Sequence, residues 1–375
     1  MRRLISATVS VVLLLLAPGL AAARVPARFV GVTVDGPALA PGFDLGGETA
    51  LMARSGVESV RMQFSWAGAQ PYPSWSAVPD AERGAFVDEH GIPTTYAALD
   101  RLVTFAAQRH LTVLPVVQYA PAWAARHPGL LGSPPAAPAP YAAFAGALVR
   151  RYGPRGSFWA THPGIPRVPI RAWEIWNEPD LPFMWADQPF GVDYLALLKA
   201  SRTAIKAADP RAQVVLGGFA NYSWRTLAYF YRLPGARAAF DAVSVHGYTR
   251  QAAGVVTILG RVRATMRRHG DAHKPILATE VGWPASRGHT KDQFGVETTA
   301  SGQAARIRTL LPLLARNRRA LGLEAFYVYT WIGEEAPGAA EFQFAGLRRI
   351  TAAGQRQSKP ALTAFRRAAR ALEAP

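Results

Sequence analysis

The sequence contains no cysteine, so every protein class that depends on this residue is excluded. A chain of 375 residues without a thiol can form no disulfide framework, no thiolate nucleophile and no cysteine-ligated zinc site. Acidic residues are also scarce, because 25 Asp and Glu stand against 42 Lys and Arg. The stability of the fold must therefore come from packing, and the chain carries a large positive charge.

Long apolar runs are absent beyond the amino terminus. There, Arg2 and Arg3 precede a mostly apolar stretch from Ile5 to Ala17, and Ala21-Ala22-Ala23 offers a small-residue cleavage site. This pattern predicts a secretory signal peptide at residues 1–23 and a secreted, extracellular protein, with an uncleaved membrane anchor as the alternative. Later stretches fall short of the roughly 18 apolar residues of a membrane span, so we expect no integral membrane segment in the mature chain.

Motifs of metal and nucleotide chemistry are missing as well. The eight His residues include no H-E-x-x-H pair, and the chain has no EF-hand loop, no Walker A sequence and no G-x-S-x-G elbow. We therefore expect neither a cofactor nor a metal ion.

The formal charge of +17 raises the question of nucleic-acid binding. The basic residues are nearly all Arg, they are scattered among Ala and Pro, and no basic stretch alternates with aromatic residues. We expect no nucleic-acid partner for this reason. A mildly anionic polysaccharide or a cell-surface partner stays open, because a positive surface would steer either one towards the protein.

Apolar and aromatic side chains are plentiful: 50% of the residues are hydrophobic, and there are 10 Trp, 12 Tyr and 17 Phe. Short β-branched runs alternate with longer Ala-, Leu- and Arg-rich stretches of helical period, which is typical of βα units. The predicted strands are residues 29–34, 59–64, 112–118, 170–176, 213–216, 242–246, 276–281 and 325–331. The predicted helices are residues 96–108, 141–151, 194–208, 226–231, 255–268, 302–316 and 361–372.

Eight strand–helix units predict an α/β fold, a single (β/α)8 TIM barrel with extended βα loops over residues 24–375, acting as a monomer. A doubly wound open sheet is the other candidate. The first strand, however, is followed by Gly36-Pro37 and not by a glycine-rich phosphate turn. Loops at residues 70–93, 133–140 and 334–344 are candidates for the walls of a cleft.

Ionisable residues at the carboxyl ends of buried strands need an explanation, and several strands carry one, two of them a glutamate. The fourth predicted strand reads WEIWNEPD and delivers Asn177 and Glu178 just before Pro179, whereas the seventh reads PILATEVGW and ends at Glu280. A closed barrel brings these two carboxylates to one mouth. Glycoside cleavage needs such a pair, because one carboxyl protonates the leaving oxygen while the other attacks or stabilises the sugar carbon.

Side-chain alternation places further polar groups inside the barrel. Arg61 could hold a nearby carboxylate ionised, or form a purely structural ion pair with Glu174. His246 and Tyr248 could orient the same carboxylate, although a lone His at a strand end is often a core residue. Flat aromatic faces that could bind a sugar ring, or simply fill the core, are offered by Trp66, Trp283 and Trp331.

These residues resemble the retaining (β/α)8 glycoside hydrolases of clan A. The resemblance rests on Asn177-Glu178, Glu280, Arg61, His246-Gly247-Tyr248, Trp331 and the tail Ser358-Lys359-Pro360-Ala361. The phrase EIWNEPD is most similar to family 39, which includes β-xylosidases and exopolysaccharide hydrolases, and family 5 comes next. The resemblance implies that Glu178 is the general acid/base, that Glu280 is the nucleophile, and that Asn177 binds the hydroxyl beside the reacting carbon.

The sequence thus favours a secreted retaining glycosidase that acts on an oligo- or polysaccharide. Two alternatives stay open. One is a transglycosidase that remodels a cell-envelope or extracellular polysaccharide, and the other is a non-catalytic carbohydrate-binding barrel.

Overall fold

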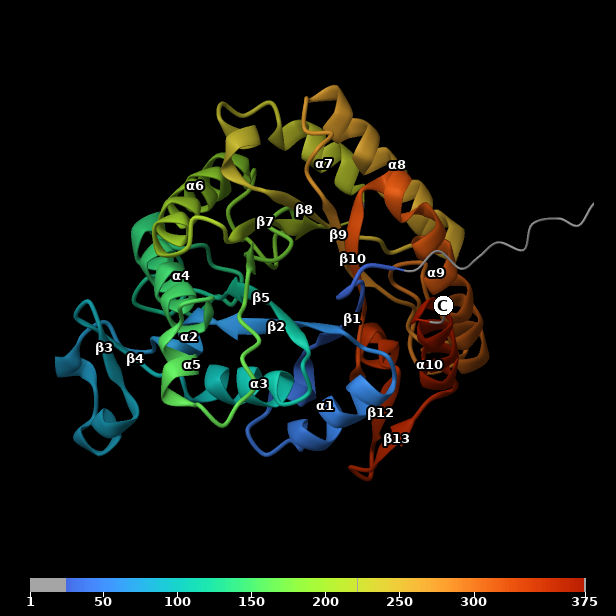
Figure 1. Cartoon of the computed structure of the whole chain (residues 1–375), viewed down its shortest axis with the longest axis horizontal. Coiled ribbons are helices and arrows are strands. Elements are labelled where there is room, and N and C mark those ends of the chain that lie inside the picture. Colours follow the sequence, from blue (N-terminus) through green and yellow to red (C-terminus); the bar gives the residue numbers. More distant parts are fainter. Residues whose placement is uncertain (1–24, 221, 374–375) are drawn as a thin grey trace, which may run out of the picture.

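The computed structural model describes residues 25–220 and 222–373, so the predicted leader at residues 1–23 lies outside the described part. Eight parallel strands close into a barrel in the order β1-β10-β9-β8-β7-β6-β5-β2 (Figure 1). The strands are β1 (Val30–Val34), β2 (Ser59–Ser65), β5 (Thr112–Gln118), β6 (Ala172–Ile175), β7 (Gln213–Phe219), β8 (Ala242–His246), β9 (Ile276–Val281) and β10 (Leu323–Val328). The predicted (β/α)8 barrel is confirmed.

The barrel strands form because their sequences are short, apolar and rich in β-branched residues, as in VGVTV of β1 and ILATEV of β9, both fully buried. The barrel closes between the two ends of the chain, where Gly31 of β1 is aligned with Ser59 of β2 and with Tyr327 of β10. Only glycine fits at position 31, because a Cβ atom there would lie 2.5 Å from the Tyr327 ring.

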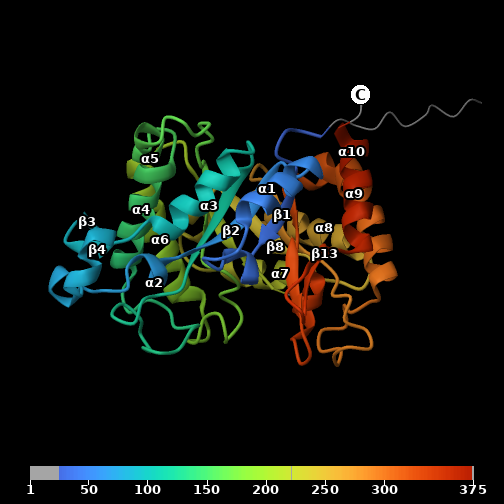
Figure 2. The same cartoon turned by 90° about the horizontal axis from the view of Figure 1, so that it is seen from below.

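Helices surround the barrel and cover the outer faces of its strands (Figures 1 and 2). They are α1 (Leu45–Arg54), α2 (Trp66–Ala69), α3 (Ala97–Ala107), α4 (Pro138–Tyr152), α5 (Ser157–Thr161), α6 (Gly191–Ala208), α7 (Ser223–Phe230), α8 (Ala252–Arg268), α9 (Ala300–Leu321) and α10 (Pro360–Glu373). Every predicted helix is present. Helix α1 was not predicted, because Gly46 and Gly47 weaken its helical signal. Asp44 nevertheless caps this helix by accepting the Gly47 N–H at 2.9 Å.

Two small sheets are added to the barrel. A hairpin of β3 (Val87–Glu89) and β4 (Ile92–Thr94) occupies the insertion at residues 70–93 and projects from one side of the molecule (Figure 1). Beyond β10, a second sheet pairs β11 (Ile332–Glu335), β12 (Arg348–Thr351) and β13 (Arg356–Ser358). The hairpin stands away from the barrel mouth, so this insertion does not wall the cleft.

The barrel interior is divided into an apolar layer and a charged layer. The apolar layer consists of Leu114, Val215, Ala242, Leu277, Ala325 and Tyr327. Nearer the carboxyl ends of the strands lie Arg61 and Glu174, which are 3% and 0% exposed. This charged layer lies directly below the side chains at the mouth of the barrel.

Across residues 25–220 and 222–373, none of the helices combines the length and the apolar character that a membrane crossing requires.

Candidate active site

Arg61 is the central cation of the charged layer. Its Nε donates to Glu174 Oε2 at 2.6 Å, its Nη1 to Glu280 Oε1 at 2.8 Å and its Nη2 to Asn177 Oδ1 at 2.7 Å. Burial opposes the charge of the guanidinium, but the carboxylates of Glu174 and Glu280 outweigh this effect and raise the pKa of Arg61. The predicted partnership of Arg61 with Glu174 is therefore present, and Arg61 holds Glu280 and Asn177 as well.

Glu280 is the last residue but one of β9 and has a hydrogen-bond donor on each carboxylate oxygen. Arg61 donates to Oε1, and the Tyr248 hydroxyl donates to Oε2 at 2.7 Å. Tyr248 is kept in this position by the ring of Phe342, 5.0 Å away between centroids. Donors on both oxygens fix the orientation of the Glu280 carboxylate, which suits a nucleophile.

Glu178 follows β6 on a strained stretch of backbone. Trp176 and Glu178 have φ angles of 64° and 43°, in the left-handed region that side chains other than glycine rarely adopt. The Glu178 N–H donates to the Gly218 carbonyl at 3.0 Å, which ties this turn to the end of β7. Backbone strain held by such contacts is frequent at functional sites, and Glu178 here lines the cavity with its carboxyl beside His246.

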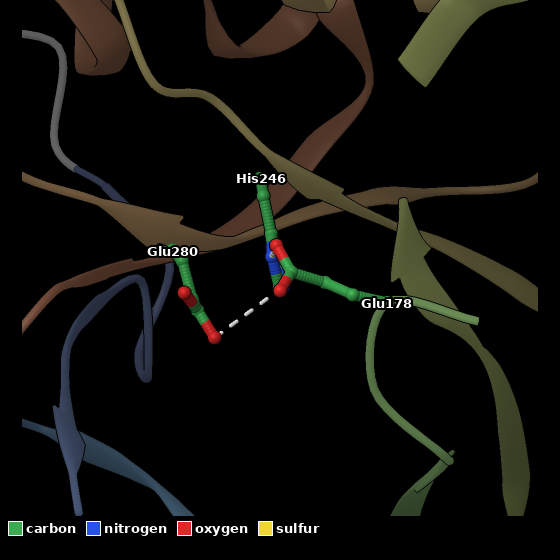
Figure 3. A group of neighbouring side chains, drawn as sticks. All are labelled: Glu178, His246 and Glu280. Carbon is green, nitrogen blue, oxygen red and sulfur yellow. Dashed lines mark hydrogen bonds and ion pairs between the residues drawn. The ribbon is translucent and has the colours of Figure 1, made fainter. Parts of the chain in front are cut away.

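His246 ends β8 and links the two carboxylates (Figure 3). Its Nδ1 lies 2.7 Å from Glu178 Oε1, and its Nε2 lies 3.5 Å from Glu280 Oε1. Burial opposes protonation of the ring, but the charges of Glu280 and Glu178 outweigh it and raise the pKa of His246. Gly218 makes room for this ring, because a Cβ atom at that position would lie 2.2 Å from His246 Nε2.

The three side chains of Glu178, His246 and Glu280 converge on one point of the mouth (Figure 3), with one ligand atom of each within 4.8 Å of the others. In the described part of the chain this is the group with the spacing of a metal site. The Arg61 guanidinium, 2.8 Å from Glu280, repels a cation at this position. The arrangement suits a nucleophile paired with a proton donor.

A cavity of about 1130 Å³ opens above these groups, and Arg61, Asn177, Glu178, Tyr248 and Glu280 line it. Because Asn177 Oδ1 accepts from Arg61, its amide N–H₂ is left as a donor towards the cavity. The polar residues that the sequence predicted for the site thus lie together in the structure. His246 positions Glu178.

The cavity also contains polar residues that the sequence analysis missed or left without a role. They are Asp35, Gln118, Tyr119, Asp180 and Tyr329. Asp35 accepts the Thr330 hydroxyl at 2.6 Å, and burial raises the pKa of its carboxyl. The signal for Asp35 was available, because it directly follows the predicted strand at residues 29–34, just as Glu178 and Glu280 lie at or close to the ends of theirs.

The substrate-binding role that the sequence offered for Trp66, Trp283 and Trp331 is wrong, and the alternative role, filling the core, is the one that the structure shows. Trp66, Trp283 and Trp331 are 0%, 1% and 0% exposed, and in the described structure none of them lines the cavity. Their indole N–H groups donate inside the protein, to Gln70, to the Thr249 carbonyl and to Glu48. For Trp331 the prediction assumed that the strand continues to residue 331. Because β10 ends at Val328, the alternation of side chains along the strand does not determine the direction of the Trp331 side chain.

The exposed aromatic residues of the cavity come from loops instead. Phe183, Tyr222 and Phe294 line the cavity and are 64%, 57% and 50% exposed. Each lies in a loop after a barrel strand, where no periodic pattern marks it in the sequence.

Asp180 gives the site a measurable pH dependence. Burial raises the pKa of its carboxyl from 3.8 to about 6, although the Ala220 N–H, 3.2 Å away, opposes the shift. A raised pKa means that its contribution to stability is full below about pH 4 and is lost as the pH rises through about 6. We expect Asp180→Asn, which keeps a hydrogen-bond acceptor, to raise the free energy of unfolding at pH 7 by about 1–3 kcal/mol.

Urea unfolding of wild type and Asp180→Asn at pH 4, 5, 6 and 7 tests this expectation. Other groups titrate in both proteins, so the difference between the two curves isolates Asp180. A difference that stays constant over this pH range would contradict the assigned shift.

Comparison with known proteins identifies the fold. No family model matches the sequence, and no curated protein does. A family 39 glycoside hydrolase from the gut symbiont Bacteroides cellulosilyticus WH2 has a TM-score of 0.64 at 19% identity, covering 93% of this chain and 64% of that chain. The family 39 enzyme from Xanthomonas axonopodis pv. citri has a TM-score of 0.61 at 19% identity, with 92% and 67% covered.

An exo-β-1,4-mannosidase from Opitutaceae bacterium strain TAV5 has a TM-score of 0.59 at 20% identity, with 94% of this chain and 61% of that chain covered. The chain therefore spans 61% to 67% of the length of these three structures. At these identities the likeness establishes a shared (β/α)8 fold.

Proposed function

We propose that the protein is a glycoside hydrolase that cleaves its substrate with retention of configuration. The observation that carries the proposal is the pair of carboxylates at the ends of β6 and β9, with oxygens within 4.8 Å of each other and different partners. Glu280 is held by Arg61 and Tyr248, and Glu178 by His246. The shared fold with family 39 enzymes supports this function.

In the first step, a Glu280 oxygen attacks the anomeric carbon while the bond from that carbon to the leaving oxygen breaks. Glu178 gives its proton to the leaving oxygen, so the products are a glycosyl ester of Glu280 and a neutral alcohol. Arg61 and Tyr248 hold the Glu280 carboxylate in position. Their hydrogen bonds to Glu280 lose ionic character because the ester is neutral, and the negative charge ends on Glu178, which has given up its proton.

In the second step, Glu178 is ionised and takes a proton from water, whose oxygen attacks the anomeric carbon and releases Glu280. His246 is a positioning residue for Glu178, because its Nδ1 lies 2.7 Å from Glu178 Oε1. The Asn177 amide faces the cavity beside both acids, where it can donate to a sugar hydroxyl.

The spacing of the carboxylates favours retention over inversion. Retaining enzymes hold their two carboxyl groups about 5–5.5 Å apart, whereas inverting enzymes need about 6.5–9.5 Å to admit a water molecule between acid and sugar. Oxygens within 4.8 Å of each other agree with the shorter spacing. Export from the cell is part of the proposal and rests on the predicted leader at residues 1–23.

The test is a panel of aryl β-glycosides together with bacterial and plant polysaccharides, followed by release of aryl alcohol or reducing ends. For the substrate that is cleaved, NMR spectroscopy identifies the anomer that forms first, and we expect it to match the substrate. Inverted product would contradict the retaining mechanism. Glycosyl transfer to sugars in place of water would favour the transglycosidase, and polymer binding without any cleavage would favour the binding protein.

A further inference from the structure

The cavity has two unlike sides. Above β1, β2, β5 and β10 it is polar, and the side chains there are Asp35, Gln63, Gln118, Tyr119 and Tyr329. Gln118 is 6% exposed, and its Oε1 has no hydrogen-bond partner among the described residues. A buried acceptor of this kind is satisfied by a hydroxyl group of a bound sugar, so this side suits the glycone.

The opposite side, above β6 and β7, is apolar. The leaving-group lobe is the set of residues from the loop after Glu178 that line this side: Leu181, Phe183, Met184, Pro189 and Phe190. Ala220, Tyr222 and Tyr229 face it from the loop and helix that follow β7. This side presents mostly carbon atoms and aromatic rings to a ligand, and its one cation among the described residues, the exposed Arg225, lies over the Tyr222 ring at 5.0 Å from the centroid.

Two polar side chains that line this side beside the lobe, Gln188 and Thr226, are engaged within the protein. Gln188 donates through Nε2 to the carbonyls of Pro179 and Trp185 at 3.1 and 2.8 Å, and its Oε1 accepts the Phe190 N–H at 3.2 Å. The Thr226 hydroxyl lies 3.4 Å from Asp180 Oδ2. A second sugar in this lobe would lose water from its hydroxyl groups and gain few partners, which is unfavourable.

The loop that carries the lobe is held in shape from below. The Trp176 indole N–H donates to the Met184 carbonyl at 2.8 Å, and the Trp176 and Trp185 rings meet edge to face at 5.3 Å. The lobe is thus formed before substrate arrives, so binding needs little free energy to order this loop.

The position of the lobe next to Glu178 indicates which part of the substrate it binds. Glu178 protonates the leaving oxygen in the proposed reaction, and the lobe begins at Leu181, whose N–H donates to the Glu178 carbonyl at 3.0 Å. We infer that the leaving group of the natural substrate is apolar, an alkyl or aryl alcohol such as a lipid-like aglycone. This inference rests on the proposed function.

Apolar surface continues outside the lobe. The Gly132 carbonyl accepts the Ala186 N–H at 2.8 Å, so the neighbouring loop adjoins the lobe and brings Leu130 and Leu131, which are 54% and 69% exposed. A long hydrocarbon chain leaving the cavity would meet this surface before water.

The test compares methyl and n-octyl β-glycosides of the same sugar below the micelle concentration, because the two leaving alcohols have similar acidity. We expect kcat/KM to be at least about tenfold higher for the octyl glycoside, since each methylene that is buried favours binding by about two- to fourfold. A disaccharide with the same glycone serves as the polar comparison and should be cleaved more slowly than the octyl glycoside.

Phe183→Ser is the diagnostic variant, because Phe183 is 64% exposed and its loss leaves the core intact. We expect it to lower the octyl-to-methyl ratio of kcat/KM by about fivefold. Val87→Ser is the control, since Val87 is 51% exposed on the distant β3–β4 hairpin, and its ratio should match that of wild type. A wild-type ratio near one, with faster cleavage of the disaccharide, would overturn the inference.

A binding experiment tests the lobe independently of whether the protein cleaves glycosides. Calorimetry with Glu178→Gln protein measures the affinity for n-octyl and methyl β-D-glucoside, β-D-xyloside and β-D-mannoside. Tighter binding of the octyl compounds that is lost in Glu178→Gln/Phe183→Ser supports the lobe, whether or not wild type cleaves them. Equal affinity for octyl and methyl compounds contradicts it.

Discussion

Glu280→Ala is expected to lower kcat/KM for an aryl β-glycoside by at least about 10⁴-fold, because Glu280 is the carboxylate that forms the glycosyl ester in the proposed reaction. Arg61 and Tyr248 donate to Glu280 and cannot attack carbon themselves. Glu178 is held by His246 in the position of the proton donor. Steady-state kinetics with an activated aryl glycoside measures the loss.

Azide distinguishes the two acids. In Glu280→Ala, azide occupies the space of the missing carboxylate and attacks directly, which gives a glycosyl azide of inverted configuration. In Glu178→Ala, the ester on Glu280 still forms and azide opens it, so the product has the configuration of the substrate. If the two variants gave the opposite configurations, Glu178 would be the nucleophile and Glu280 the general acid/base. Glu82→Ala is the control, because Glu82 is an exposed carboxylate in the insertion at residues 70–93.

Arg61→Met is expected to destabilise the fold by about 3–5 kcal/mol, because it leaves two buried carboxylates without their cation. Glu174 is 0% exposed and Glu280 is 8% exposed. The residual partners of Glu174 are the Ser244 hydroxyl at 2.8 Å and the Gly218 N–H at 3.2 Å, which donate to Oε1 but do not neutralise its charge. Urea unfolding at pH 7 measures the loss of stability.

The double variant Arg61→Met/Glu174→Gln is the matched test. Removing the second charge relieves part of the penalty, so the double variant is expected to be more stable than Arg61→Met alone. It should remain inactive, since Glu280 still lacks its donor at Oε1. An Arg61→Met protein as stable as wild type would mean that the buried carboxylates are not charged.

The fold and the acidic pair were predictable because local patterns encode them. A strand of the barrel is buried on both sides, so a carboxylate at its end, such as Glu178 or Glu280, stands out from the apolar run before it. Alternation along β2 and β8 likewise predicted that Arg61 and His246 point inward. Asp35 carries the same signal and was overlooked, whereas Gly46 and Gly47 concealed α1.

The loop residues of the cavity were not predictable in the same way. Whether Trp331 faces the mouth depends on where β10 ends, and the position of Phe183 depends on the hydrogen bond between Trp176 and Met184. Neither feature repeats with a strand or helix period. Aromatic residues that sequence reasoning assigned to sugar binding therefore fill the core, and the exposed rings of the cavity belong to loops.

The way in which the barrel closes has a consequence for biosynthesis. Arg61 meets carboxylates 113 and 219 residues further along the chain, and the Thr330 hydroxyl donates to the Thr33 carbonyl, 297 residues away. Contacts over such separations form late in folding, because the intervening chain must be ordered first. A nascent chain that still lacks β10 has no closed mouth and no Tyr329, so the candidate active site is completed only after nearly the whole chain has been synthesised.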